Sequence, residues 1–502
     1  VNSPNALDGN NESKLDSASA KFQAEAGVVD FTGDEETIAN GVRQLVSMLP
    51  ANNEEDAAVS ATTDDLNRAC PDMAAEIADP ALALSDIADD NVFVEVKASY
   101  AKEMVTGFIQ VDGITIGAVA NRTALYDEEG EVAEKFEEMG FKKLWDPDKV
   151  VLIYDHLVPA SQQDDTRHFR IGNAFAEKYG MTHVHRSDGI CHQLMTEAGY
   201  VKPGDIAFGT DSHTTTYGCV GAFSSGIGYT EMASILGTGT MWIRVPETIK
   251  VVINGKLPEN VMSKDVILRL IGDLGADGAT YKALEFSGSA VENMTVASRM
   301  TISNMAIEAG AKCALFTPDE KTAEYCNVTL NDYQKSLFGD PDAAYCRVME
   351  YNAEDFVPVM ACPSQVDKIR NVSELEGTEI DQIFIGSCTN GRLEDLAAAA
   401  EVLKGKQVAK FVKLIVTPAS RKIYRQAADL ETLAEAGAMI THPGCGLCCG
   451  RAGGILTDGE RVVATNNRNF LGRMGTSKVQ IYLASPRTAA ACAVAGKIVC
   501  PE

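Results

Sequence analysis

The chain has 502 residues, of which 45% are hydrophobic and 23% are charged, and its net charge is −27. This length allows about two to four domains. The acidic balance disfavours a nucleic-acid partner, because phosphate binding needs a basic surface. No run approaches about 18 consecutive apolar residues, so we expect no membrane span. The 13 cysteines, with no secretion signal in the first residues, indicate a reducing, cytoplasmic compartment.

Acidic side chains are unevenly distributed along the chain. Residues 1–135 carry 27 acidic and 8 basic side chains, a balance of −19, and the other 367 residues carry −8. Such asymmetry indicates two parts of different character. We therefore expect a segment 1–135 followed by a larger part, 136–502.

In the first part, spaced apolar residues predict an amphipathic helix over 35–48, with Leu45 and Met48 on its apolar face. Two strand-like runs follow, at 92–96 and 106–120. The second run is broken by a turn at Asp112-Gly113, which predicts a hairpin.

After residue 135, apolar runs alternate with helical patterns and glycine-rich turns. Buried parallel strands have this character, so the second part is predicted to be α/β. The predicted strands are 150–154, 206–209, 383–385, 413–417, 462–464 and 479–483. Polar motifs follow four of them, where α/β sheets bind their ligands: Asp155-His156, Asp211-Ser212-His213, Cys388 and Asn467-Arg468.

Three cysteines suggest a metal centre. Cys388 lies in Ile-Gly-Ser-Cys-Thr-Asn, and Cys445 and Cys448 lie in Pro-Gly-Cys-Gly-Leu-Cys-Cys-Gly. Three thiolates suit a [4Fe-4S] cluster that leaves one iron open as a Lewis acid. A Cys-x-x-Cys pair alone also serves zinc sites, redox pairs and turns. Nearby glycines favour the cluster by letting main-chain N–H groups approach the sulfurs, and adjacent Cys449 is interpreted as a packing residue.

From about Glu137 to Glu502 the chain resembles the large subunit of the aconitase superfamily, and within it the isopropylmalate and dimethylmalate dehydratase branch. The matching stretches include Tyr-Asp-His-Leu-Val-Pro, Gly-Ile-Cys-His-Gln, Gly-Thr-Asp-Ser-His-Thr-Thr-Thr-Tyr-Gly, Thr-Ile-Ser-Asn-Met-Ala-Ile-Glu, Gly-Ser-Cys-Thr-Asn and Asn-Arg-Asn-Phe-Leu-Gly-Arg. The resemblance implies an aconitase-type three-domain α/β/α core around a central cluster. It also implies a hydro-lyase that removes and re-adds water on a 2-hydroxy di- or tricarboxylic acid.

Residues 1–135 are similar to part of the carboxyltransferase subunit of biotin-dependent acyl-CoA carboxylases and decarboxylases. The similarity rests on Val-Arg-Gln-Leu-Val-Ser-Met-Leu-Pro-Ala-Asn-Asn, Phe-Val-Glu-Val-Lys-Ala-Ser-Tyr-Ala-Lys-Glu-Met and Ile-Gly-Ala-Val-Ala-Asn-Arg-Thr. It implies a partial crotonase-like α/β fragment without its glycine-rich oxyanion loops. We therefore expect a chimera whose two parts join near residues 134–137. In it, the carboxyltransferase-like fragment replaces the opening segment of the dehydratase.

The aconitase resemblance also assigns roles to individual residues. Cys388, Cys445 and Cys448 would hold the cluster, and the Asp155-His156 pair would donate the proton to the leaving hydroxyl. Four residues would orient that hydroxyl and the bound water: His192, Asp211, His213 and Glu308. Asn304 and Asn467 would give neutral hydrogen bonds, and Arg468 and Arg473 would clamp a carboxylate.

Simpler interpretations remain open for several of these residues. An Asp-x-His sequence is often a capped turn, Asn-Arg-Asn is compatible with a solvated turn, and Glu308 with a surface helix. The other four histidines, His168, His183, His185 and His442, are expected to be structural.

The family resemblance places the proton-abstracting serine on a small swivelling subunit, so it implies an obligate protein partner. The sequence does not distinguish isopropylmalate, dimethylmalate, citramalate and homocitrate as substrates. Two alternatives stay open: a fragment of a biotin-dependent acyl-CoA carboxyltransferase or decarboxylase subunit, and a catalytically impaired chimera.

Overall fold

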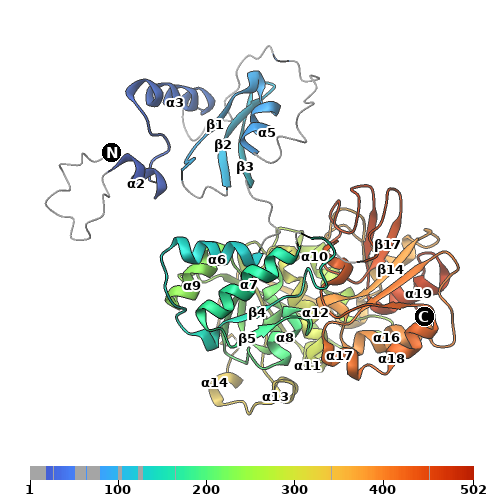
Figure 1. Ribbon diagram of the computed structural model, residues 1–502. Helices are drawn as coiled ribbons and strands as arrows, with labels where there is room; N and C mark the ends of the chain where they lie inside the picture. The colour runs from blue at the N-terminus through green and yellow to red at the C-terminus, as the bar shows by residue number, and fades with distance from the viewer. Residues whose placement is uncertain are drawn as a thin grey trace. The chain divides into compact units, whose positions relative to one another are not determined.

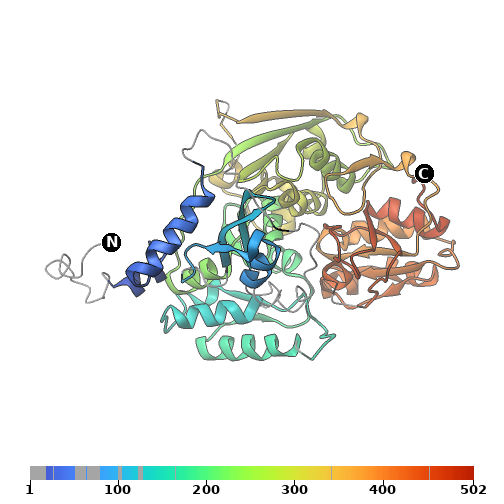
Figure 2. The same cartoon turned by 90° about the horizontal axis from the view of Figure 1, so that it is seen from above.

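The computed structural model describes residues 19–26, 28–50, 64, 80–99, 104–121, 128–163, 165–337, 339–340, 342–450 and 453–502. The chain divides into two compact units, Val1–Asp127, blue in Figures 1 and 2, and Glu128–Glu502, teal to red. The boundary expected after residue 135 lies within helix α6 (Glu128–Glu138), which belongs to the second unit. The division into domains 1–135 and 136–502 stays a prediction.

The first unit contains an antiparallel three-stranded sheet in the order β1-β2-β3. Its elements are α2 (Ala20–Glu25), α3 (Glu35–Met48), α5 (Pro80–Ile87), β1 (Phe93–Glu95), β2 (Met104–Val111) and β3 (Ile114–Asn121). Helix α3 has the predicted bounds because the Asp34 carboxylate caps it, accepting from Thr37 N at 2.8 Å. The predicted hairpin is also confirmed, and both Asp112 and Gly113 adopt positive φ in its turn.

The second unit is α/β, as predicted. One sheet has seven strands in the order β13-β12-β18-β17-β14-β15-β16, and the run from β18 to β16 is parallel. Its strands are β12 (Val359–Ala361), β13 (Ile369–Asn371), β14 (Gln382–Gly386), β15 (Lys413–Thr417), β16 (Met439–Ile440), β17 (Arg461–Ala464) and β18 (Gln480–Leu483). Helices α16 (Leu393–Leu403) and α19 (Pro486–Ala495) pack on each other and on β14.

The other strands of this unit form smaller parallel sheets. Four strands follow the order β10-β9-β8-β11, and two pairs are β4-β5 and β6-β7. Their bounds are β4 (Val151–Ile153), β5 (His183–His185), β6 (Ile206–Gly209), β7 (Phe223–Gly226), β8 (Glu247–Asn254), β9 (Lys282–Ser287), β10 (Cys313–Phe316) and β11 (Arg347–Asn352). The remaining α-helices are α7 (Asp165–Tyr179), α8 (Cys191–Glu197), α9 (Tyr229–Thr238), α10 (Ser263–Leu274), α11 (Ser289–Asn293), α12 (Val296–Met305), α13 (Glu320–Cys326), α14 (Asp332–Lys335), α15 (Ser387–Asn390), α17 (Arg421–Gln426) and α18 (Asp429–Glu435).

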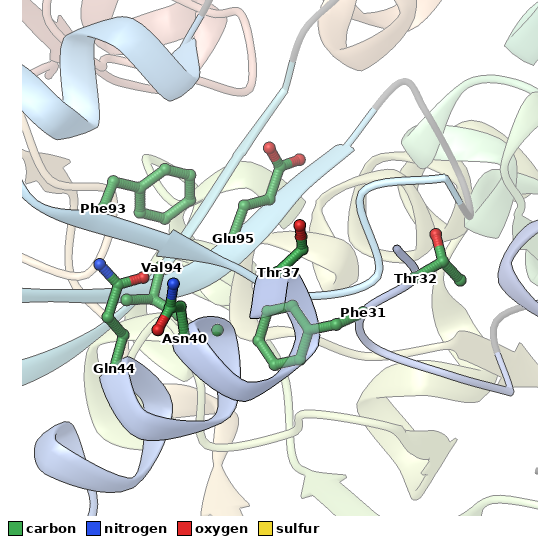
Figure 3. Close-up of a pocket in the computed structure, with 9 residues that line it drawn as sticks. Phe31, Thr32, Thr37, Asn40, Gln44, Phe93, Val94 and Glu95 are labelled. Carbon is green, nitrogen blue, oxygen red and sulfur yellow. The ribbon is translucent and has the colours of Figure 1, made fainter. Parts of the chain in front are cut away.

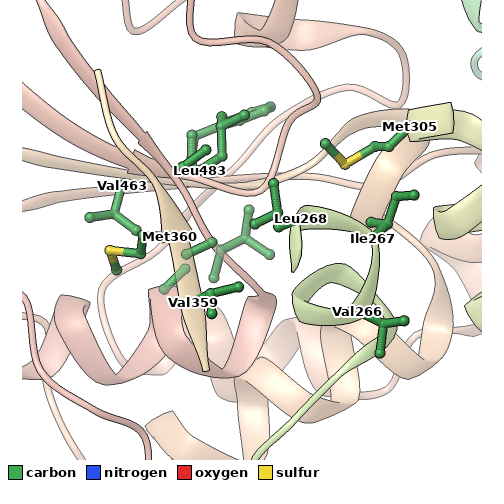
Figure 4. Close-up of a cluster of buried hydrophobic side chains, with 14 of the residues drawn as sticks. Val266, Ile267, Leu268, Met305, Val359, Met360, Val463 and Leu483 are labelled. Carbon is green, nitrogen blue, oxygen red and sulfur yellow. The ribbon is translucent and has the colours of Figure 1, made fainter. Parts of the chain in front are cut away.

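A continuous apolar core joins helix α10 to the seven-stranded sheet. Figure 4 shows Val266, Ile267 and Leu268 of α10 together with Met360 of β12 and Leu483 of β18. All five side chains are buried. This packing fixes the start of α10 relative to the polar turns that follow the parallel strands. No helix in the described part of the chain is long and apolar enough to cross a membrane.

A second apolar cluster forms where helix α6 packs against α7 and α9. Phe136 of α6 is completely buried, and its ring centroid lies 5.2, 5.4 and 5.0 Å from those of Phe141, Phe175 and Tyr179. Aromatic contacts at these separations add to the free energy gained by burying the rings. The residues near the expected sequence junction therefore contribute to the core of the second unit.

We predict that Phe136→Ala lowers the free energy of unfolding of the second unit by about 3–5 kcal/mol, the usual cost of deleting a buried ring. Both tryptophans of the chain, Trp145 and Trp242, lie in this unit, so urea unfolding followed by their fluorescence measures it. Phe411→Ala is the matched control, since Phe411 is 85% exposed, and it should change stability by less than about 0.5 kcal/mol. Equal effects of the two substitutions would contradict this packing role.

Candidate functional site

The polar motifs of the second unit lie at the ends of parallel strands, as predicted. Asp155 and His156 follow β4, and Asp211 follows β6 and caps the 3₁₀ segment η3 (Ser212–Val220). Cys388 lies in α15, directly after β14, and Asn467 follows β17. Glu308 comes from η4 (Ala306–Ala309), which continues α12.

The Asp211 carboxylate brings three predicted histidines together. Its Oδ1 lies 3.0 Å from His192 Nε2 and 3.2 Å from His213 Nδ1, and it accepts the His213 backbone N–H at 2.7 Å. Its Oδ2 lies 3.3 Å from His156 Nε2. Burial raises the pKa of Asp211, but the charge of His192 and the hydrogen bonds from the imidazoles outweigh it and hold that pKa well below its usual value.

Asp155 and His156 form a hydrogen-bonded pair. His156 Nδ1 lies 2.6 Å from Asp155 Oδ1, and Asp155 Oδ2 accepts from Cys191 N at 2.6 Å. Burial works against the charge of Asp155, but His156 and the Cys191 N–H together keep the pKa of this carboxyl below its usual value. The carboxylate therefore fixes the imidazole so that Nε2 points toward Asp211, while the ring stays 28% exposed.

Glu308 joins the histidine group to Arg468. Its Oε1 lies 2.8 Å from His213 Nε2 and accepts from Arg468 Nε at 2.9 Å. Arg468 Nη2 also donates to Ser212 Oγ at 2.9 Å. Burial raises the pKa of Glu308, but His213 and Arg468 bring it below its usual value. Glu308 is only 6% exposed, so the surface-helix interpretation is wrong.

The three predicted cysteines converge in a buried place next to this group. Asn467 lies between two of them: its Nδ2 is 3.5 Å from Cys388 Sγ, and its Oδ1 is 3.4 Å from Cys448 Sγ. Cys445 and Cys448 share a hydrogen bond, which lowers the pKa of Cys448 and raises that of Cys445. Each of the three residues is at most 2% exposed.

Unusual backbone conformations accompany the cysteine turns. Gly386 has φ 141°, and a Cβ there would lie 2.1 Å from Thr417 O; Ser387 next to it has φ 66°. Gly446, between Cys445 and Cys448, has φ 64°. Positive φ costs little for glycine but is strained for serine, and such strain concentrates at functional sites.

The three thiols do not all lie as close together as the ligands of one zinc ion, whose sulfurs come to about 4 Å from one another. Among the residues that the structure describes, the group whose ligand atoms all lie within 4.8 Å of one another is His192, Asp211 and His213. The two imidazoles of that group are already hydrogen-bonded to the Asp211 carboxylate. Asn304 Nδ2 lies 3.3 Å from Cys388 Sγ, as expected for an amide that supports a ligating sulfur.

Arg473 lies beside Cys448, with Nη2 3.9 Å from its sulfur. Its Nε is buried and has no hydrogen-bond partner among the described residues. A buried donor without a partner is costly, and an anionic group at the sulfurs would satisfy it. Cys449 instead directs its thiol to the carbonyl oxygens of His156, at 3.5 Å, and Gly446, at 3.4 Å.

Two buried cations next to the turns that carry Cys388 and Asn467 were not predicted from the sequence. The Arg392 guanidinium donates to the carbonyl oxygens of Cys388 and, at 2.7 Å, Thr389. Lys264 donates to the carbonyl oxygens of Thr465 and Asn466. Arg392 follows Cys388 by four residues and could have been found from that spacing, whereas no local pattern marks Lys264.

The first unit has a hollow of its own, shown in Figure 3. It lies between α3, β1 and the loop before α3, and its lining includes Phe31, Asn40, Gln44, Phe93 and Glu95. Among the described residues that line it there is no lysine or arginine. A site for the phosphates of coenzyme A would need such cations.

The fold and the site together define an α/β enzyme with a buried centre of thiols, imidazoles and carboxylates. The model of the aconitase family (aconitate hydratase) matches residues 110–376 and 366–496, and that of the carboxyl transferase domain matches residues 10–174. The chain belongs to the aconitase family and is a hydro-lyase, and it also carries a segment of the carboxyl transferase type.

Curated relatives agree with this assignment. The chain is 49% identical over 373 residues to "3-isopropylmalate dehydratase large subunit 1" of Methanopyrus kandleri. The aligned region covers 74% of this chain and 89% of that protein. It is 45% identical over 371 residues to "Probable methanogen homoaconitase large subunit" of Methanosarcina mazei, covering 73% and 94%. Among solved structures, aconitase X of Thermococcus kodakaraensis is 15% identical with a TM-score of 0.41, covering 69% of this chain and 81% of that one.

We predict that Glu308→Gln lowers the pKa of His213. Burial and Arg468 lower this pKa, but hydrogen bonds to Asp211 and Glu308 bring it above its usual value. The stability gained from protonated His213 is thus complete below about pH 6.5 and is lost as the pH rises through the raised pKa. The variant should lose stability mainly below that pKa, so its deficit should shrink as the pH rises through it.

The measurement is a histidine ¹³Cε1 NMR titration of the metal-free protein, together with thermal unfolding at pH 6 and pH 8. Glu374→Gln is the control, because Glu374 forms an exposed ion pair with Arg370. An unchanged His213 midpoint in Glu308→Gln would show that Glu308 does not hold the proton on this ring.

Proposed function

We propose that this chain is the large subunit of a [4Fe-4S]-dependent hydro-lyase that dehydrates and rehydrates a 2-hydroxy di- or tricarboxylic acid of the isopropylmalate or dimethylmalate type. The observation that carries the proposal is the convergence of Cys388, Cys445 and Cys448 beside the histidine and carboxylate group. The names of the curated relatives support the same reaction class.

Cys388, Cys445 and Cys448 would hold the cluster, which when bound supplies Lewis-acid chemistry to the hydroxyl that leaves. Asn304 and Asn467 would direct amide hydrogens to Cys388 Sγ, from 3.3 and 3.5 Å. Burial raises the pKa of the Cys388 thiol to about 11. The surroundings of Cys388 thus disfavour a free thiolate, and a metal would be the natural partner of its deprotonated sulfur.

His156 is the proposed proton donor. Asp155 holds its Nδ1, so the proton available for transfer is on Nε2, the atom that lies toward Asp211. A general acid must come within hydrogen-bond reach of the leaving oxygen, and the partly exposed His156 ring can do so.

The remaining residues would orient and bind the substrate. His192, Asp211, His213 and Glu308 form one hydrogen-bonded group that would fix the hydroxyl and a water molecule. Arg468 uses two of its five N–H groups on Glu308 and Ser212, and the others can bind a substrate carboxylate. Arg473, with its unsatisfied Nε, would add a second cationic contact near Cys448.

The reaction also needs a base that removes the carbon-bound proton. We propose that this base is a serine on a separate small subunit, and the naming of the relatives as large subunits supports such a partner. The substituent that distinguishes isopropylmalate from dimethylmalate would then be read mainly by that subunit.

A carboxyltransferase activity is the alternative, because residues 10–174 match the carboxyl transferase model. The hollow of the first unit does not favour acyl-CoA binding, since the part of its lining that the structure describes offers the carboxylate of Glu95 and no cation. We therefore assign the segment no catalytic role in the proposed function. A fusion that is impaired as a dehydratase is distinguished by the activity measurement below.

We predict that anaerobic reconstitution gives about four iron and four sulfide per chain. Cys388→Ser should lose most of this iron, because two thiolates cannot hold the cluster in place. Cys449→Ser should retain it, since this adjacent thiol is directed to two carbonyl oxygens. Iron and sulfide analysis with an electron paramagnetic resonance spectrum makes the comparison. A wild-type protein that binds only zinc, or equal iron in both variants, would refute the assignment.

We also predict that the reconstituted chain alone shows negligible turnover of isopropylmalate. Adding the small subunit of an archaeal isopropylmalate dehydratase should raise the rate by at least about 100-fold, the usual contribution of a general base. In the presence of that subunit, His156→Gln should lower the rate by about 10²–10⁴-fold. High activity of the chain alone would exclude the subunit as the source of the base, and inactivity with the subunit would identify an impaired fusion.

A further inference from the structure

Lys264 is a buried lysine that the proposed reaction leaves without a role. It is the second residue of helix α10 and is 0% exposed. Its Nζ donates to the carbonyl oxygens of Thr465, at 2.9 Å, and Asn466, at 2.6 Å. A positive charge in the first turn of a helix opposes the helix dipole, so the stability of α10 does not explain this lysine.

Lys264 forms no ion pair with a carboxylate among the residues that the structure describes. The nearby acidic groups have other partners: Glu308 pairs with Arg468, and Asp395 with Arg392. Neighbouring Asp265 accepts the backbone N–H groups of Met262 and Val359. A buried ammonium without a counter-charge is costly, so a compensating anion is expected in its surroundings.

The cysteine sulfurs are the groups that can supply that anion. Burial lowers the pKa of Lys264 to about 7, and the strongest opposing influences are Cys448 and then Cys388. A cluster core held by three thiolates carries a net negative charge. The protein would thus bury the Lys264 ammonium close to the anionic thiolates. No carboxylate among the described residues would compete with the thiolates for this ammonium.

The carbonyls that Lys264 holds belong to the turn that supports the thiols. Thr465 and Asn466 immediately precede Asn467, which lies between Cys388 and Cys448. The Thr465 hydroxyl also accepts the backbone N–H of Gly386 at 2.9 Å, at the start of the turn that carries Cys388. One ammonium is therefore connected to both turns that meet at the candidate centre.

We propose that Lys264 is a positioning residue that fixes the Thr465–Asn467 turn and, through its charge, is the buried counter-ion of the thiolate-bound cluster. The inference rests on the proposed function for its charge role. Its positioning role concerns the protein alone and can be measured without metal.

The test compares three variants of Lys264 with a matched lysine elsewhere. Lys264→Met removes the charge and the donors, Lys264→Gln removes the charge but keeps a donor, and Lys264→Arg keeps the charge. Lys321→Met is the control, because Lys321 is also the second residue of its helix, α13, and donates to two carbonyl oxygens, of Glu292 and Met294. Lys321 differs in being exposed.

The readouts are the reduction potential of the reconstituted cluster, its retention of iron against a chelator, and amide hydrogen exchange of the 465–474 region in the metal-free protein. Lys264→Met and Lys264→Gln should shift the potential to more negative values and weaken iron retention by roughly 10–100-fold. Lys264→Met should also exchange faster in the 465–474 region, whereas Lys264→Arg and Lys321→Met should keep the wild-type potential. Should Lys264→Met not fold, Lys264→Gln decides the charge role.

Failure of the inference and failure of the proposed function are distinguishable. A wild-type protein that holds no cluster would overturn the function and the counter-ion role together. A wild-type protein with a cluster, and neutral variants that match it in potential and iron retention, would overturn the inference alone. Unchanged hydrogen exchange in Lys264→Met would remove the positioning role.

Discussion

Three imidazoles share the carboxylate of Asp211, and this shared acceptor connects segments that are far apart in the sequence. His156 follows β4, His192 is the second residue of α8, and His213 lies in η3, yet all three rings reach the same carboxylate. This arrangement is stable only while the Asp211 carboxylate is ionised. The imidazoles keep it ionised, because they hold the pKa of Asp211 well below its usual value. Geometry and charge therefore support each other: displacing one ring would weaken the hold on the other two.

The same balance of charge extends to the sulfurs. Burial alone favours neutral thiols, as the raised pKa of Cys388 indicates. Around these thiols the chain places buried or half-buried cations from separate elements, Lys264, Arg392 and Arg473. Arg392 has Asp395 as its counter-charge. Lys264, however, would be hard to keep charged inside the protein without an anion, because desolvation costs more than hydrogen bonds to carbonyl oxygens return. The surroundings of the three thiols are thus suited to an anionic occupant.

The sequence was sufficient to predict the strands that precede the polar motifs, β4, β6, β14 and β17, and the position of the motifs after them, because both follow from one pattern. Buried parallel strands are apolar runs, and α/β sheets bind ligands at the residues that follow the carboxyl ends of such strands, although here the strands belong to three separate sheets. The order of the strands in the sheet could not be predicted from the sequence. For example, β12 pairs antiparallel with β18, a strand that is distant from it in the sequence. Lys264 could not be found either: a lysine at the start of a helix normally points to solvent, and only tertiary packing buries it.

Helix α6 shows how two sequence families can meet without a break in the fold. The helix lies where the matches to the two family models overlap, between residues 110 and 174. What the second unit requires from this position is an apolar face, and Val132, Ala133 and Phe136 provide it against α7 and α9. Packing of this kind depends on size and hydrophobicity more than on exact sequence. A helix from either family can therefore complete this edge of the unit, whereas the turns of the candidate site, which need exact hydrogen-bonding groups, all lie within the residues that the aconitase family model matches.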